Sequence, residues 1–152
     1  MTNKVTIEEL GGRGDGVTTL DGKSIFVPFS APGDKADINI DGNKGRLRHI
    51  HQSSSYRVKA KCKHFTKCGG CAVQHIDEKY YRLWKAGLVR IALENQGFNN
   101  IDVRPLEMSP LHSRRRTTFH VIGRNDSNIV FGYAEKGSHN LIDLQECPIL
   151  VT

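Results

Sequence analysis

The 152-residue sequence has no long hydrophobic run and only four cysteines. Because a transmembrane helix needs about 20 consecutive apolar residues, the sequence predicts no membrane span. Residues 1–5 contain none of the apolar core of a secretory signal, so an exported, disulfide-stabilised protein is not favoured. With 38% hydrophobic residues, the chain is expected to be globular and cytoplasmic, with one moderate domain or two small ones.

A nucleotide-binding loop is missing as well. Residues 11–16, Gly-Gly-Arg-Gly-Asp-Gly, are rich enough in glycine to suggest a phosphate loop. However, no Gly-Lys-Ser/Thr sequence follows, and no long helix is expected directly after the run. We therefore interpret these residues as a turn between strands.

Acidic residues are absent from residues 42–76, which contain eight Lys and Arg. Residues 1–41 have four Lys/Arg against seven Asp/Glu, and residues 77–152 have ten against nine, so the net charge of +6 comes from the middle of the chain. Neutralisation of nucleic-acid phosphates is one interpretation, and a solvated basic face beside anionic thiolates is the other. The cations of this basic tract are Lys44, Arg46, Arg48, Arg57, Lys59, Lys61, Lys63 and Lys67.

Three of the four cysteines, Cys62, Cys68 and Cys71, lie within ten residues, and Cys147 precedes a proline. Structural zinc usually uses cysteine pairs about two to four residues apart on two separate knuckles, which differs from the spacing here. Iron–sulfur clusters accept three clustered thiolates and a distant one, and a Cys-Pro sequence is known for the remote ligand. The spacing therefore favours an iron–sulfur cluster and leaves zinc and disulfides open.

Five short strands are predicted in the first fifty residues. They cover residues 4–10, 17–20, 23–29, 35–40 and 45–51, with Asp21-Gly22 as a hairpin turn. Short strands joined by tight glycine turns fit a small OB-like β-barrel.

One long helix is predicted after the cysteine loop, over residues 76–95, with Asp77 as its N-cap and Gly97 beyond its end. Its apolar stripe is expected to face a core and runs through Tyr80, Trp84, Leu88 and Ile91. Further strands are predicted at residues 102–108, 117–122, 129–134 and 141–144, with a hairpin loop at 125–127. The predicted fold class is mainly β with one long helix (α+β).

The residues around the cysteines resemble a known family. Arg57-Val58, Cys62, His64-Phe65, Cys68-Gly69-Gly70-Cys71 and Gln74-His75 are similar to the iron–sulfur segment of bacterial RNA (uracil-5-)-methyltransferases of the ribosomal RNA branch. The similarity continues at Gly132-Tyr133 and through residues 138–143 to Cys147-Pro148. By this resemblance the cofactor is a [4Fe-4S] cluster on Cys62, Cys68, Cys71 and Cys147.

The first fifty residues resemble a TRAM domain, a module that generally binds RNA. Leu10, Gly14, Gly16, residues 26–28 and Pro32-Gly33-Asp34 match its pattern, with Asp34 where glutamate is usual. The resemblance therefore implies an OB-like TRAM barrel at residues 1–56, followed at residues 57–152 by an iron–sulfur α+β domain that is cut short.

RNA is the partner that the resemblance implies, with ribosomal RNA first and transfer RNA as the alternative. Arg114–Arg116 resembles a family segment that ends in an arginine pair, although Ser113 stands where an aromatic residue is common. Phosphate contacts combined with stacking of exposed bases are typical of such recognition. The candidate RNA-binding residues are Arg46, Arg48, Lys59, Lys61, Lys63, Phe65, Arg114, Arg115 and Arg116.

For the whole enzyme, the resemblance implies synthesis of 5-methyluridine from S-adenosylmethionine, by addition of a thiolate to carbon 6 of a flipped-out uracil and methylation of carbon 5. The S-adenosylmethionine domain that the resemblance implies has a glycine-rich cofactor loop, a nucleophilic cysteine and a general base. None of these can be placed in these residues, and the cluster already uses all four cysteines. We therefore expect the N-terminal part of a longer enzyme, monomeric and inactive by itself. By the same resemblance, the alternative for the helix at residues 76–95 is that its stripe packs against the catalytic domain and is exposed here. The alternative is a stand-alone RNA-binding protein with a structural iron–sulfur or zinc site.

Overall fold

The computed structural model describes residues 2–125 and 128–151 of the chain. Their contacts group the chain into two units. Unit 1 comprises Met1–Val58 and His75–Glu107, and unit 2 comprises Lys59–Gln74 and Met108–Thr152. The chain therefore leaves unit 1 to form the cysteine loop, returns to unit 1, and leaves it again. The domain boundary between residues 56 and 57 stays a prediction.

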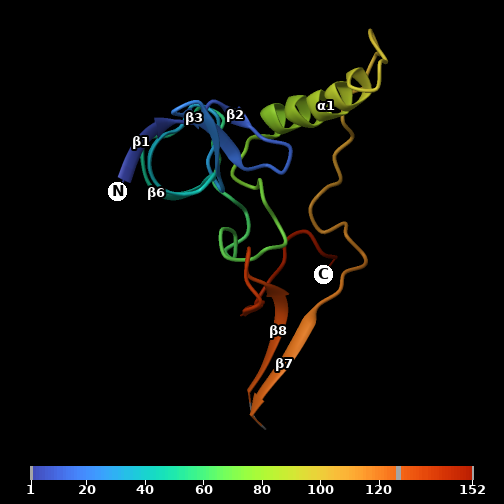
Figure 1. The fold of residues 1–152 in the computed structure, drawn as a ribbon. Coiled ribbons are helices and arrows are strands. Elements are labelled where there is room, and N and C mark those ends of the chain that lie inside the picture. The colour runs from blue at the N-terminus through green and yellow to red at the C-terminus, as the bar shows by residue number, and fades with distance from the viewer. Residues whose placement is uncertain (1, 126–127, 152) are drawn as a thin grey trace. The chain divides into compact units, whose positions relative to one another are not determined.

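Unit 1 contains a curled six-stranded sheet (Figure 1). Its strand order is β1-β5-β6-β4-β3-β2, and neighbours are antiparallel except for the parallel pair β4 and β6. The strands are β1 (Thr2–Thr6), β2 (Glu9–Leu10), β3 (Gly16–Leu20), β4 (Lys23–Val27), β5 (Lys35–Asp41) and β6 (Lys44–Gln52). A curled sheet of short strands agrees with the predicted TRAM-like fold.

The single strand predicted at residues 4–10 is divided into β1 and β2. Ile7 N donates to Asp34 O at 2.9 Å, and Glu8 N donates to Val17 O at 2.8 Å. The backbone thus changes its pairing partner from β5 to β3 between these two residues. A local sequence pattern carries no information about such a change of partner.

The core of unit 1 lies where apolar side chains of the curled sheet meet. Five buried side chains form its central cluster, and each contributes roughly 1.5–3 kcal/mol relative to an exposed position. They are Val5, Ile7, Ile25, Val27 and Ile38.

A buried carboxylate fixes the turn before β5. Asp34 accepts hydrogen bonds from Ala31 N at 2.7 Å and from Ser54 N at 2.9 Å. The Arg57 guanidinium also pairs with it and donates to Phe29 O at 2.9 Å. Burial alone would raise the pKa of Asp34, but the hydrogen bonds from Arg57, Ser54 and Ala31 outweigh it and hold the pKa below its usual value.

The helix α1 (Glu78–Glu94) agrees with the prediction in type and bounds. Asp77 caps it by accepting a hydrogen bond from Tyr80 N at 2.9 Å, and Gly97 follows it with a φ of 86°. The expected core face is only partly covered: Trp84 Nε1 donates to Leu10 O at 3.2 Å, but Ile91 is 55% exposed and no residue of α1 is buried. The prediction of a buried stripe is therefore wrong.

Residues 102–108 form no strand, contrary to the prediction. Alternating apolar residues make a strand only where another strand supplies a hydrogen-bonded ladder. In this segment Leu106 O instead accepts a hydrogen bond from the Arg82 guanidinium of α1. The segment is therefore held by a side chain of the helix.

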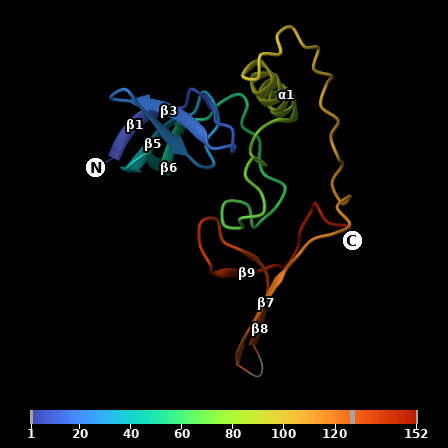
Figure 2. The ribbon, with the colours of Figure 1, turned by 45° about the vertical axis from the view of Figure 1, so that its right-hand side comes forward.

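Unit 2 contains a three-stranded antiparallel sheet in the order β7-β8-β9 (Figure 2). Its strands are β7 (His120–Asn125), β8 (Asn128–Ala134) and β9 (Leu141–Asp143). The strands predicted at 129–134 and 141–144 are confirmed, and the one predicted at 117–122 begins later. The loop predicted at 125–127 includes Asp126 and Ser127, which lie outside the described residues.

Within the described residues, no helix is long and apolar enough to cross a membrane. The mainly β fold with one long helix agrees with the sequence. The iron–sulfur α+β domain stays a prediction.

Candidate metal centre and RNA-binding surface

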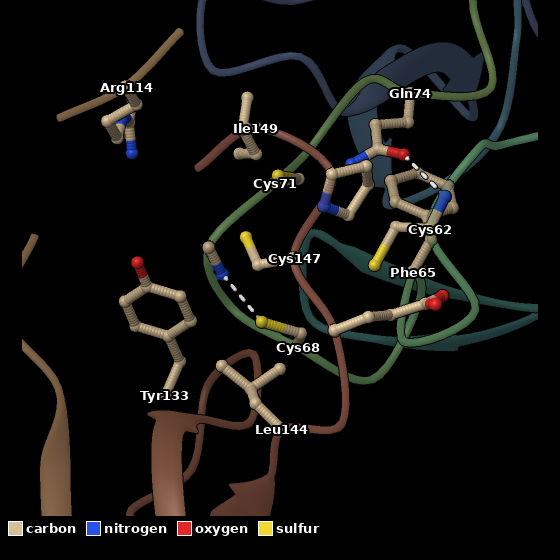
Figure 3. A pocket seen from close by; sticks show the side chains of 13 residues that line it. Cys62, Phe65, Cys68, Cys71, Gln74, Arg114, Tyr133, Leu144, Cys147 and Ile149 are labelled. Carbon is tan, nitrogen blue, oxygen red and sulfur yellow. Dashed lines mark hydrogen bonds between the residues drawn. The ribbon is translucent and has the colours of Figure 1, made fainter. Parts of the chain in front are cut away.

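All four cysteines line one cavity of about 50 Å³ in unit 2. Figure 3 shows their side chains around this space, with Tyr133 among the other lining residues. Three of them come from the loop at residues 62–71, and Cys147 follows β9. The fold thus brings together the four residues predicted as metal ligands.

Hydrogen bonds within the loop set the positions of its cysteines. Cys68 N donates to His64 O at 2.9 Å, and Cys62 N donates to the Gln74 side chain at 3.1 Å. The loop also joins the end of β8, where Gly69 N donates to Ala134 O at 2.9 Å. A Cβ at Gly69 would lie 2.9 Å from that oxygen, so glycine permits the close approach.

Cys147 is held by the segment that precedes β7. His112 N donates to Pro148 O at 3.0 Å, and Arg114 N donates to Ile149 O at 2.9 Å. Gln145 N donates to the His64 ring at 3.3 Å, which connects this segment to the cysteine loop. The fourth cysteine is therefore positioned by backbone contacts on both of its sides.

The surroundings of Cys71 raise the pKa of its thiol. Burial raises the pKa of Cys71 most, a hydrogen bond from Gln74 lowers it, and the neighbouring Cys147, Cys68 and Cys62 raise it further. Gly70 N donates to Cys68 Sγ at 3.4 Å. Burial and the neighbouring cysteines therefore both favour the neutral form of the Cys71 thiol.

The all-sulfur donor set fits a soft metal group, either an iron–sulfur cluster or zinc. All four cysteines are free rather than disulfide-bonded. Among the described residues, no three His, Cys, Asp or Glu side chains are gathered closely enough to ligate a single metal ion. The residue types and their common cavity, rather than a preformed ion site, make the four cysteines candidate ligands.

The candidate RNA-binding cations are all exposed, but they belong to both units. Arg46 and Arg48 lie on β6 of unit 1. In unit 2, Phe65 is half-buried and lines the cysteine cavity. The candidate cations of unit 2 are Lys59, Lys61, Lys63, Arg114, Arg115 and Arg116. Arg57, the remaining arginine of the basic tract, serves the fold through Asp34 instead.

Sequence reasoning missed an aromatic cluster on the sheet of unit 2. The Phe119 ring centroid lies 4.4 Å from that of Phe131 and 5.0 Å from that of Tyr133. The i, i+2 spacing of Phe131 and Tyr133 was a signal that both side chains share one face of a strand.

Comparison with known proteins agrees with this architecture. Residues 3–49 match the family model described as tRNA (uracil(54)-C(5))-methyltransferase, TRAM domain. An uncharacterized RNA methyltransferase of Brucella suis is 38% identical over 150 residues, covering 99% of this chain and 36% of that protein. The 23S rRNA (uracil(1939)-C(5))-methyltransferase RlmD of Pectobacterium carotovorum is 31% identical over 153 residues, covering 96% of this chain and 34% of that protein.

The matches define a TRAM-containing chain related over nearly its whole length to RNA methyltransferases. This relation agrees with the family resemblance of the cysteine and TRAM motifs. It spans about a third of the length of the curated relatives it matches.

Proposed function

We propose that this chain is the RNA-binding and cluster-carrying part of an S-adenosylmethionine-dependent RNA (uracil-5-)-methyltransferase that makes 5-methyluridine in 23S rRNA. The observation that carries the proposal is the common cavity that Cys147 shares with Cys62, Cys68 and Cys71, although 76 positions separate Cys147 from Cys71. The TRAM match at residues 3–49 and a relative named for uracil methylation support it.

In this proposal the four thiolates hold a [4Fe-4S] cluster. The cluster supplies positive charge against the crowded thiolates and cross-links the cysteine loop to the segment after β9. Its role here is to hold unit 2 in shape, since a ligand set drawn from two distant segments connects them covalently through the metal. Exposed cations of unit 2 would then contact RNA phosphates.

The chemistry of methyl transfer belongs to the complete enzyme in this proposal. Because the cluster uses all four cysteines, no thiol of this chain remains to attack a uracil. The chain alone should neither bind S-adenosylmethionine nor methylate RNA. We further propose that it acts in the cytoplasm as a monomer.

The test of the metal assignment is anaerobic purification followed by metal and sulfide analysis. A [4Fe-4S] cluster predicts brown protein with broad absorbance at about 400 nm and about four iron and four sulfide per chain. Colourless protein with one zinc per chain would assign a zinc site instead. Binding of the same sample to labelled 23S rRNA fragments tests the RNA assignment independently.

A further inference from the structure

The sheet of unit 2 presents an aromatic face, which we define as Phe119, Phe131 and Tyr133. Val121 lies opposite Phe131 in the β7–β8 register, so these two side chains project from the same side of the sheet. Strand alternation places Phe119 and Tyr133 on that side too, as the ring distances of 4.4 and 5.0 Å from Phe119 to its neighbours confirm. The face therefore combines a row of three rings with aliphatic neighbours.

This face is partly open to solvent, because Phe131 is exposed whereas Phe119 and Tyr133 are half-buried. Phe131 is 42% exposed, and the neighbouring Val121 and Ile129 are 61% and 66% exposed. Adjacent large apolar side chains that stay exposed usually mark a binding surface.

A groove of about 620 Å³ runs along the aromatic face. Phe119 and Phe131 line it, together with Lys61 and His112. It shares Cys147 and three neighbouring residues with the cysteine cavity, so the two sites have a common wall. Its volume is within the range of roughly 300–1,000 Å³ that is typical of ligand sites.

The charge around the groove favours a polyanion. Unit 2 contains nine Lys/Arg against four Asp/Glu, which is most of the net charge of the chain. Arg114, Arg115 and Arg116 stand just before Phe119, are exposed, and form no ion pair within the described residues. Glu146, an acidic residue of the groove, lies 3.9 Å from Lys63 Nζ.

We propose that this groove binds single-stranded RNA, with unstacked bases lying on Phe119 and Phe131 and the phosphates meeting Lys61 and the three arginines. The inference rests on the proposed function and assigns the base-binding surface within it. Flat exposed rings next to unpaired cations are the combination that single-stranded nucleic acids require, because both bases and phosphates need partners. A protein partner would match the apolar face but would leave the cations without counter-charges.

The test measures binding of a fluorescein-labelled oligouridylate of about ten nucleotides by anisotropy, at matched iron content. Phe131→Leu keeps an apolar side chain but removes the ring, and should weaken binding about fivefold to one-hundredfold if one base stacks there. Phe131→Trp should retain the affinity. Ile122→Ala, a matched control on the other side of β7, should leave it unchanged, because Ile122 pairs with Val130 and is also exposed.

A second measurement does not depend on a variant. Photo-crosslinking of wild-type protein to 5-bromouridine RNA should modify the tryptic peptides 117–124 and 125–136, which contain the three rings. Equal affinities of wild type and Phe131→Leu, with crosslinks elsewhere, would overturn the groove assignment while RNA binding itself stands. The groove assignment would also be overturned if the wild type self-associates and Phe131→Leu dissociates it without changing the RNA affinity. Absence of any RNA binding by the wild type would reject the RNA part of the proposed function as well.

Discussion

Arg57 and Arg114 carry the same charge, but their surroundings give them different roles. Arg57 pairs with the buried Asp34, whereas Arg114 is exposed and its backbone is bound to Ile149. The sequence places Arg57 in the basic tract, for which phosphate neutralisation is one interpretation, because a run of basic residues does not show which member has a buried partner. Burial, which depends on residues far along the chain, decides between the two roles.

Replacing Asp34 by asparagine should lower the free energy of unfolding by about 3 kcal/mol at neutral pH, since it leaves Arg57 without its counter-charge. The folded-state pKa of Asp34 lies below that of the unfolded chain. Its stabilisation is therefore complete above the unfolded pKa of about 3.9 and is lost as the pH falls through the lower folded value. Urea denaturation at a series of pH values should show the unfolding free energies of the wild type and Asp34→Asn converging below about pH 4.

Asp41→Asn is the control for this comparison, because Asp41 is exposed at the end of β5. It should change the unfolding free energy by less than about 0.5 kcal/mol. An Asp34→Asn protein as stable as Asp41→Asn would show that the ion pair does not hold the turn.

At the scale of elements, the helix and strands that carry local sequence signals, such as capping residues or alternation, were predictable. Helix α1 is bounded by Asp77 and by Gly97, both readable from sequence, and β8 follows from alternation. The irregular segment 102–108 was not predictable, and the sequence left open whether the stripe of α1 is covered, because both depend on what packs against them. The cysteines of the site could be named from spacing and resemblance, but the aromatic face depends on strand register, which the sequence does not display.

The close approach of β8 and β9 at Gly132 provides an element-scale prediction. A Cβ at this position would lie 2.1 Å from Ile142 O and 2.9 Å from the Leu144 side chain. Gly132→Ala should therefore separate β9 from β8, destabilise unit 2 by about 1–3 kcal/mol and reduce iron retention through Cys147. Gly123→Ala in β7 meets no atom within 4 Å and should leave both quantities unchanged. Thermal melts and iron analysis of the two variants compare them directly.

Cys147 provides a second prediction at this scale. Cys147→Ser should make the cluster labile and loosen the strands of unit 2, because it removes the only ligand outside the cysteine loop. Iron release to a chelator should be faster than in the wild type, and the melting temperature should be lower. Unchanged iron content and melting temperature would show that Cys147 is not a ligand.

At the scale of the whole molecule, the distribution of charge predicts how RNA affinity depends on salt. Each phosphate contact with single-stranded RNA contributes about 0.7 log units of affinity per tenfold change in salt. Changing Arg114, Arg115 and Arg116 together to alanine should therefore flatten the slope of log affinity against log salt concentration by up to about two. Salt titrations of RNA binding at matched cluster content would measure the change.

The control for the salt titration removes three exposed cations of unit 1, as Lys79→Ala, Arg90→Ala and Arg104→Ala together. It lowers the net charge equally, so a general electrostatic effect would flatten both slopes alike. A specific role of the arginine triplet requires that only the first slope changes.

The order of the two units along the chain has a consequence for synthesis. The last strand of the curled sheet, β6, ends at Gln52, so the ribosome delivers that whole sheet early. Cys71 and Cys147 are separated by 76 positions, which corresponds to about 4–15 seconds of translation. A metal centre on the four cysteines can therefore be completed only after the TRAM sheet has emerged, and during that interval three thiols are available to any metal-delivery protein that reaches the nascent chain.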